Sequence, residues 1–148
     1  MASHSGYTGK LFEQEVLATC QVSWDGHSYV PFQKALRLVR ENQPWDPTDP
    51  SKRAGEDLHA QVAIALELDD FSELSFLSAL GTPLDFFHGI DALFEWRGRV
   101  VTIDLTTNPH KDSYKADLII RPEDGDDQWQ SVAIEIANCL RIKSACAA

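Results

Sequence analysis

The stretch IDALFEWRGRVVTIDLT, residues 90–106, predicts a β-hairpin and guides the interpretation of the remaining chain. On both sides of Arg97 and Gly98 the sequence is rich in Val, Ile, Thr, Phe and Trp, which favour strands. Gly98 suits a two-residue turn, because glycine adopts a positive φ without steric cost. The sequence therefore predicts two antiparallel strands joined at this turn.

The register of this hairpin places two aspartates opposite each other. If the turn comprises Arg97 and Gly98, Asp91 faces Asp104 with the two Cβ atoms about 5 Å apart. A turn shifted by one residue breaks this pair. Two like charges so close are destabilising unless a divalent cation offsets them, one carboxyl is protonated, or solvent screens them. The first alternative predicts a metal site on Asp91 and Asp104.

Alternation along the two strands predicts one apolar and one mixed face of the hairpin. The apolar face comprises Ile90, Ala92, Phe94, Val101, Ile103 and Leu105. The mixed face comprises Asp91, Leu93, Glu95, Val100, Thr102, Asp104 and Thr106. Burial of the apolar face would fix the register, because a slip of one residue exchanges the faces.

Helical patterns surround the hairpin, so the predicted fold class is α+β, with helices packed on a small mixed sheet. They cover residues 9–20, a segment from Pro31, residues 50–68 after an Asp49 N-cap, and residues 70–80. Residues 116–121 predict a third strand. Residues 129–143 fit a helix or a strand; we favour the helix because its pattern extends further. We expect one domain, residues 1–148, with a helical part over 9–80, a β core over 88–121 and a C-terminal helix over 129–143.

Composition narrows the class of protein. The 148 residues are 43% hydrophobic, enough for one domain with a core, and contain no apolar run of the roughly 20 residues that a membrane span needs. An odd set of three cysteines without CxxC spacing predicts a reducing, cytoplasmic compartment. The net charge of −10 argues against strong non-specific binding of nucleic acid, although carboxylates that hold metal also add negative charge.

Two short motifs resemble the PD-(D/E)XK nuclease superfamily, which has the restriction-endonuclease-like fold. GID at residues 89–91 resembles the first element, and DLT at residues 104–106 resembles the second. The resemblance extends over residues 55–121. It departs from the family pattern at Thr106, where a lysine is usual, and between residues 106 and 116, where the family usually places a full helix.

The resemblance implies metal-dependent hydrolysis of phosphodiester bonds, in DNA rather than RNA, and allows a homodimer. Asp91, Asp104 and a helix-borne Glu56 would hold Mg²⁺ or Mn²⁺. Lys111 would replace the missing lysine and orient the attacking water or contact phosphate. Glu56 and Lys111 also have plainer interpretations. Acids are favoured early in a helix, and lysines in polar loops are usually solvated. Secondary candidates are Glu13, Glu15, His88, Lys115 and Asp117.

A non-enzymatic alternative fits the same residues. Thr106 and the charge of −10 are also expected of a catalytically inactive nuclease-like domain that acts as an acidic protein-interaction module. A hydrolase with a Ser, His and Asp arrangement is disfavoured, because the sequence contains no Gly-x-Ser-x-Gly. A metal that binds the native state alone must raise the melting temperature, which separates the first two classes.

Overall fold

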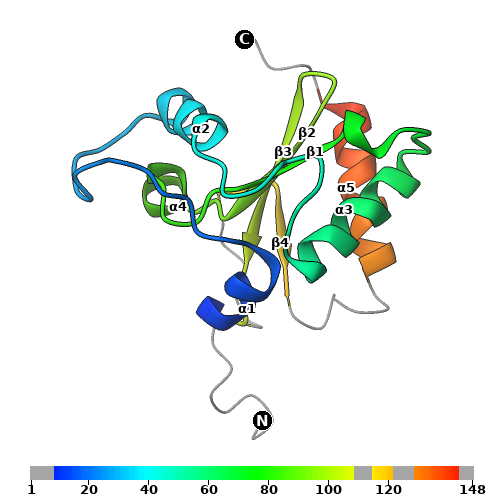
Figure 1. The fold of residues 1–148 in the computed structure, drawn as a ribbon, viewed down its shortest axis with the longest axis horizontal. Coiled ribbons are helices and arrows are strands. Elements are labelled where there is room, and N and C mark those ends of the chain that lie inside the picture. The colour runs from blue at the N-terminus through cyan, green and yellow to red at the C-terminus, as the bar shows by residue number, and fades with distance from the viewer. Residues whose placement is uncertain (1–8, 109–114, 122–128, 144–148) are drawn as a thin grey trace, which may run out of the picture.

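A four-stranded mixed sheet lies at the centre of the computed structural model, which describes residues 9–108, 115–121 and 129–143 (Figure 1). Its strands, in spatial order, are β1 (Ser75–Ser78), β2 (Ala92–Trp96), β3 (Arg99–Leu105) and β4 (Leu118–Ile120). β1, β2 and β3 pair antiparallel, and β4 pairs parallel to β3. The expected α+β class with a mixed sheet is therefore confirmed.

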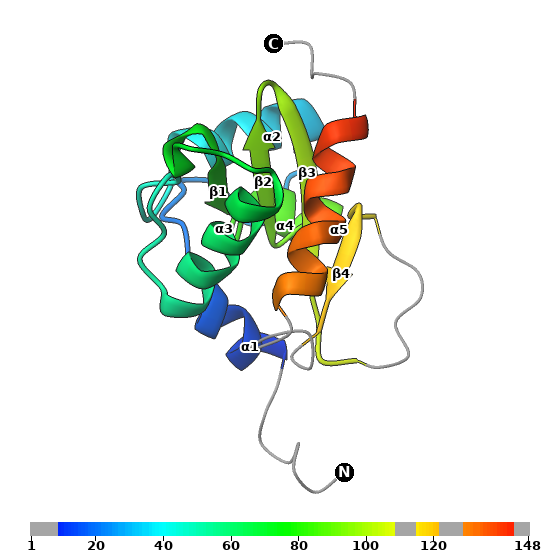
Figure 2. The ribbon, with the colours of Figure 1, turned by 90° about the vertical axis from the view of Figure 1, so that its right-hand side faces the viewer.

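Helices cover both faces of the sheet (Figures 1 and 2). α3 (Arg53–Ala65) and α5 (Trp129–Ile142) lie on one face, and α2 (Phe32–Glu41) and α4 (Pro83–His88) lie on the other. α1 (Gly9–Val16) contacts α3 and the end of β3. None of the helices in the described part of the chain has the length and apolar character that a membrane span requires.

The hairpin has the register that the sequence predicts. Trp96 pairs with Arg99, and Ala92 pairs with Ile103. The turn residues Arg97 and Gly98 have φ of 51° and 75°, the two positive values of a type I′ turn. This turn matches the natural twist of the strands, so local chemistry alone specifies the register.

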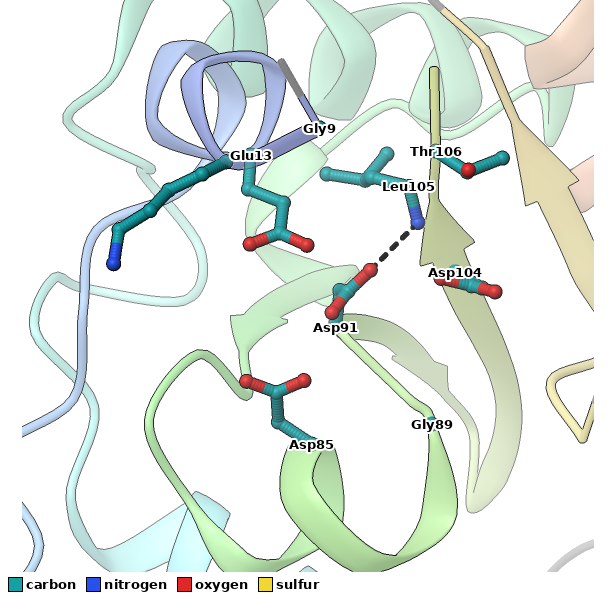
Figure 3. Close-up of a pocket in the computed structure, with 9 residues that line it drawn as sticks. Gly9, Glu13, Asp85, Gly89, Asp91, Asp104, Leu105 and Thr106 are labelled. Carbon is teal, nitrogen blue, oxygen red and sulfur yellow. Dashed lines mark hydrogen bonds between the residues drawn. The ribbon is translucent and has the colours of Figure 1, made fainter. Parts of the chain in front are cut away.

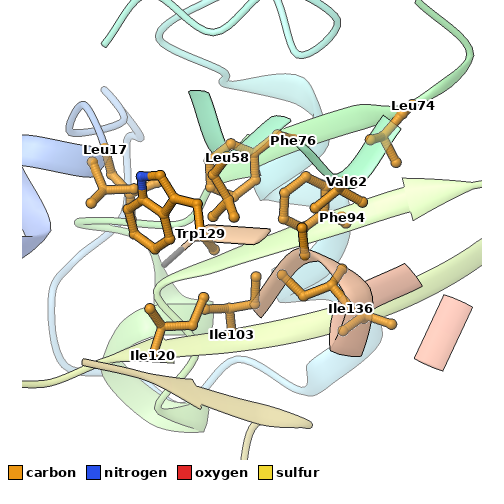
Figure 4. Close-up of a cluster of buried hydrophobic side chains, with 14 of the residues drawn as sticks. Leu17, Leu58, Val62, Leu74, Phe76, Phe94, Ile103, Ile120, Trp129 and Ile136 are labelled. Atoms are coloured by element: carbon orange, nitrogen blue, oxygen red, sulfur yellow. The ribbon is translucent and has the colours of Figure 1, made fainter. Parts of the chain in front are cut away.

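The larger apolar core fills the space between the sheet and α3, α5 and α1 (Figure 4). Phe76 of β1 stacks on Phe94 of β2 with ring centroids 4.3 Å apart, and Ile136 of α5 is fully buried in the same cluster. Gly55 permits the close approach of α1 to α3, since a Cβ there would lie 2.6 Å from the Val16 carbonyl oxygen. The contact fixes α1 against the end of the sheet.

The mixed face of the hairpin is buried as well, beneath α2 and α4. A second cluster there includes Leu77, Leu93 and Val100. Ile90 belongs to this cluster, so its placement on the opposite, apolar face is wrong. Ile90 precedes β2 and follows Gly89, the left-handed C-cap of α4, so strand alternation does not apply to it.

The helix expected over residues 70–80 is wrong. A short 3₁₀ helix (Phe71–Glu73) is followed by β1, which forms the edge of the sheet. A short apolar run fits a buried strand and a buried helix equally well, and its pairing with β2 favours the strand. The interpretation of residues 9–80 as a purely helical part is corrected accordingly.

Several boundaries also differ. α3 begins at Arg53 after the N-cap Lys52, and Asp49 instead belongs to a turn in which its backbone N–H bonds to the Asp46 carbonyl. The first helix ends at Val16 rather than at residue 20. The helix from Pro31, the strand within 116–121 and the C-terminal helix are confirmed as α2, β4 and α5.

Candidate functional site

An acidic pocket opens where α1, α4 and the end of β3 meet (Figure 3). Its volume is about 420 Å³. Four of its lining residues are acids: Glu13, Asp85, Asp91 and Asp104. Lys10 is the basic residue among the described residues that line it. We call this cavity the acidic pocket.

Asp91 is fixed at the base of the pocket by its backbone and its side chain. Its N–H donates to the Ile103 carbonyl at 2.9 Å, and its own carbonyl accepts from Ala79 N–H at 2.8 Å. One carboxyl oxygen accepts from the backbone N–H of Leu105 at 2.8 Å, shown dashed in Figure 3. Asp91 therefore bonds to β3 through its side chain, which leaves its carboxyl little freedom.

Asp104 lies beside Asp91 in the pocket, although the paired register of the hairpin ends at Ala92 and Ile103 and the N–H of Asp91 bonds to the Ile103 carbonyl. Asp104 belongs to β3 and lines the same pocket. Asp91 and Asp104 are only 3% and 6% exposed. Solvent screening, one of the three ways to tolerate the pair, is therefore weak here, and a proton or a cation must offset most of the repulsion.

Two further acids approach Asp91 from neighbouring helices. In Figure 3 the carboxyls of Glu13 from α1 and Asp85 from α4 turn toward Asp91. A carboxyl oxygen of Asp85 accepts from Gly81 N–H at 3.2 Å, which holds this side chain at the start of α4. The pocket thus gathers acids from three elements that are distant in sequence.

The electrostatics of the pocket favour a proton on Asp91. Burial raises the pKa of Asp91 far above its ordinary value, and the charge of Glu13, hydrogen bonding with Asp104 and the charge of Asp85 raise it further. The bond from Leu105 N–H lowers this pKa in part. Burial also raises the pKa of Asp85. With no cation bound, Asp91 therefore holds a proton at neutral pH.

Three of the remaining sequence candidates, Glu56, Lys115 and Asp117, are described by the structure and do not line the pocket. Glu56 is exposed on α3 and does not line the pocket, whereas Glu13, a secondary candidate from the sequence, does. Lys111 lies outside the described residues. Lys115 donates to the Phe87 carbonyl at 3.2 Å, and Asp117 pairs with Lys143 at 2.7 Å.

Asp85 is not among the candidates from the sequence, because no helix was predicted over α4. Thr82 and Pro83 follow the helix predicted over residues 70–80, and they begin α4: the Thr82 hydroxyl accepts from Leu84 and Asp85 N–H, and Pro83 occupies the first turn. Thr followed by Pro is a known start signal. Applying this signal would have placed Asp85 in a helix just before Asp91.

A hard divalent cation fits the donors of this pocket. They are carboxylate oxygens, the ligands that Mg²⁺ and Mn²⁺ prefer. As placed, no three His, Cys, Asp or Glu side chains of the described ranges converge on one point as a metal group. A Mg²⁺ ion needs only one or two carboxylates when water and substrate oxygens complete its shell, so Asp91 and Asp104 satisfy this minimum.

The chain matches no family model, no curated protein and no solved structure. The geometry of the site is a mixed sheet with two adjoining buried aspartates, reached by acids from two helices.

Proposed function

We propose that this protein is a metal-dependent nuclease that hydrolyses phosphodiester bonds in DNA, with Mg²⁺ or Mn²⁺ held by Asp91 and Asp104. The observation that carries the proposal is the pair of adjoining aspartates, both more than nine-tenths buried, at the base of an open pocket. Burial of two acids together has a large electrostatic cost. A bound divalent cation would offset this electrostatic cost, which accounts for the two acids being buried together.

When bound, the cation lowers the pKa of a coordinated water and stabilises the charge that develops on the phosphate. The protein residues supply position and charge. Leu105 N–H keeps the Asp91 carboxyl in one orientation. Asp91 must release its proton before it binds a cation, and Glu13 and Asp85 lie close enough to favour the cation electrostatically.

The missing lysine has a replacement within the pocket lining. Thr106 cannot supply a positive charge, but Lys10 lines the same cavity from α1. A lysine there contacts a phosphate as a point charge. Lys111 remains a second candidate from the sequence. Glu13, rather than Glu56, is the helix-borne acid in this proposal.

The alternative is an inactive domain that serves as an acidic interaction module. The proton that Asp91 holds neutralises part of the cluster without any metal, so a folded and inactive protein is physically reasonable. This alternative predicts neither metal-dependent stabilisation nor cleavage. The same experiment therefore tests both functions.

Thermal unfolding with EDTA, Mg²⁺ or Mn²⁺ at mildly alkaline pH tests the metal site. At a concentration 100-fold above its dissociation constant, a cation stabilises the native state by about 2.7 kcal/mol, so the melting temperature rises clearly. Asp91→Ala and Asp104→Ala should abolish the rise. Asp57→Ala, which removes an exposed aspartate of α3, should keep it.

Cleavage of circular and linear DNA completes the test. The wild type and Asp57→Ala should cut DNA with either metal, and the two pocket variants should lose activity. An unchanged melting temperature at millimolar metal, together with intact DNA, supports the interaction module. A rise that persists in both pocket variants would place the metal elsewhere and overturn the proposed site.

A further inference from the structure

Six aromatic rings form a continuous surface beside α4. They come from the loop before α2, the first residue of α2, and α4 itself: Trp24, Tyr29, Phe32, Phe86, Phe87 and His88. Neighbouring centroids are 4.9–5.8 Å apart and the contacts are edge-to-face or tilted. We call these six residues the aromatic surface.

The aromatic surface differs from the aromatic residues of the core. Phe76 and Phe94 are at most 1% exposed, whereas Phe86 is 64% exposed and Tyr29 is 66% exposed. None of the six rings is fully buried. Packing of the loop onto α4 does not require such exposure, and large exposed aromatic rings usually mark a binding surface.

Composition indicates which class of ligand fits. The large exposed aliphatic side chains of the described residues lie elsewhere: on α1, α3 and α5, as Leu11, Ile64, Ile134 and Ile142. The large apolar side chains exposed beside α4 are therefore aromatic. Flat rings with exposed faces are the features that bind unpaired bases by stacking.

Positive charge adjoins these rings. A cleft of about 220 Å³ contains Phe32 together with Lys115 and Lys143. Lys115 Nζ donates to the carbonyl of Phe87 at 3.2 Å, so this ammonium lies at the edge of the aromatic surface. Lys143 is paired with Asp117, but the described partner of Lys115 is a neutral carbonyl. Rings for bases and an ammonium for phosphate thus occur together.

The aromatic surface also adjoins the acidic pocket. The short helix α4 contributes Asp85 to the pocket and Phe86 to the surface, at consecutive positions. On β3, Asp104 lines the pocket and Thr102 lines the lysine cleft two residues away. Alternate residues of a strand share one face, so the two sites follow one another along it.

We infer that the aromatic surface and Lys115 bind single-stranded nucleic acid, with unpaired bases stacked on Tyr29 and Phe86. The acidic pocket then acts on the backbone of a single-stranded region, a step that rests on the proposed function. Binding itself needs no metal. A duplex binds poorly, because its bases already stack on one another and cannot reach the rings.

Fluorescence anisotropy in EDTA tests binding apart from catalysis. The probe is a labelled DNA of mixed sequence and about 20 nucleotides, longer than one binding site, single-stranded or as a blunt duplex. The single strand should bind at least about tenfold more tightly than the duplex. Phe86→Leu and Tyr29→Leu keep an apolar side chain without a π-face, and each should weaken binding about fivefold or more.

Matched variants identify the cause. Phe86→Trp should retain binding, and Ile64→Leu, at an exposed aliphatic position of α3, should have no effect. Lys115→Ala should reduce the salt dependence of affinity. Equal affinity for the duplex, or unchanged binding by both leucine variants, overturns the inference. A dimer formed through the aromatic surface would also overturn the inference, because the surface would then be an apolar protein contact. Such a contact tolerates leucine, so Phe86→Leu would still dimerise.

The binding and metal tests fail separately. Loss of single-strand binding in EDTA with intact metal stabilisation rejects the aromatic surface and leaves the nuclease proposal standing. Single-strand binding that depends on Phe86 without any metal effect rejects the nuclease proposal and retains the binding site. Each result therefore decides one proposal.

Discussion

The two faces of the central sheet differ in what they bury. The face toward α3 and α5 packs large apolar side chains such as Phe76, Phe94 and Ile136. The face toward α2 and α4 has a smaller apolar cluster and also buries Asp91 and Asp104. The first face stabilises the fold and the second carries an electrostatic cost, as expected where a protein maintains a functional site.

The comparison predicts opposite signs for substitutions on the two faces. Truncation of a buried ring removes contacts and leaves a cavity. Replacement of a buried acid by a neutral amide removes a group whose ionisation the fold disfavours. Three substitutions, ordered from the largest effect to the smallest, test this contrast.

Phe94→Ala should lower the free energy of unfolding by about 3–5 kcal/mol, because Phe94 is fully buried and stacked on Phe76. Equilibrium unfolding in urea measures this change. Phe71→Ala is the matched control, since Phe71 is 37% exposed and should lose far less. Similar losses in both variants would mean that the cluster of Phe94 is not the main core.

Asp91→Asn should raise the free energy of unfolding at neutral pH without metal, by about 1–3 kcal/mol, allowing for relaxation of the site. Asparagine keeps an oxygen to accept from Leu105 N–H, and unlike Asp91 it does not have to take up a proton when the chain folds at neutral pH. Urea unfolding in EDTA gives the stability, and the metal-induced rise in melting temperature should disappear. A clear loss of stability would show that the Asp91 carboxylate is favourable without a cation.

The pH dependence of stability tests independently whether ionisation of Asp91 disfavours the native state. The pKa of Asp91 is raised in the native state, so the native state binds more protons than the unfolded chain. The contribution of Asp91 to stability is therefore greatest below the ordinary aspartate pKa and falls as pH rises toward the raised value. The part of the decrease in unfolding free energy that is due to Asp91 should be absent in Asp91→Asn. An identical pH profile in both proteins would exclude a raised pKa at Asp91.

Glu13→Gln should weaken Mn²⁺ binding about tenfold with little change in metal-free stability, because Glu13 is partly exposed and faces the pocket. Glu56→Gln is the matched control on a neighbouring helix and should leave the affinity unchanged. Titration calorimetry measures both. The reverse result would restore Glu56, the residue that the sequence favoured, as the helix-borne acid.

Local signals predicted the hairpin and its acidic pair. Gly98 identified the turn, and the alternation of residues fixed which side chains face one another. Long periodic patterns likewise identified α2 and α5. These features succeed because turn chemistry and periodicity act within a few residues, where the sequence is directly informative.

Features that depend on distant partners were missed. Residues 75–78 form a strand because β2 offers a pairing edge, and no local pattern reveals that edge. Glu13 and Glu56 both lie on helices in the N-terminal half of the chain. Only the packing of α1 against α3 at Gly55 shows that Glu13 is the one that lines the pocket. The aromatic surface combines residues 24–32 with 86–88, so spacing could not predict it.

The sequence by itself determined the α+β class, through its helical and strand periodicity, and the register of the hairpin, through the chemistry of a two-residue turn. Tertiary structure alone decided that both faces of the sheet are buried, that Asp91, Asp104, Glu13 and Asp85 share one pocket, and that burial raises the pKa of Asp91. Burial and electrostatic repulsion depend on which distant elements pack together, so they exist only in the folded chain.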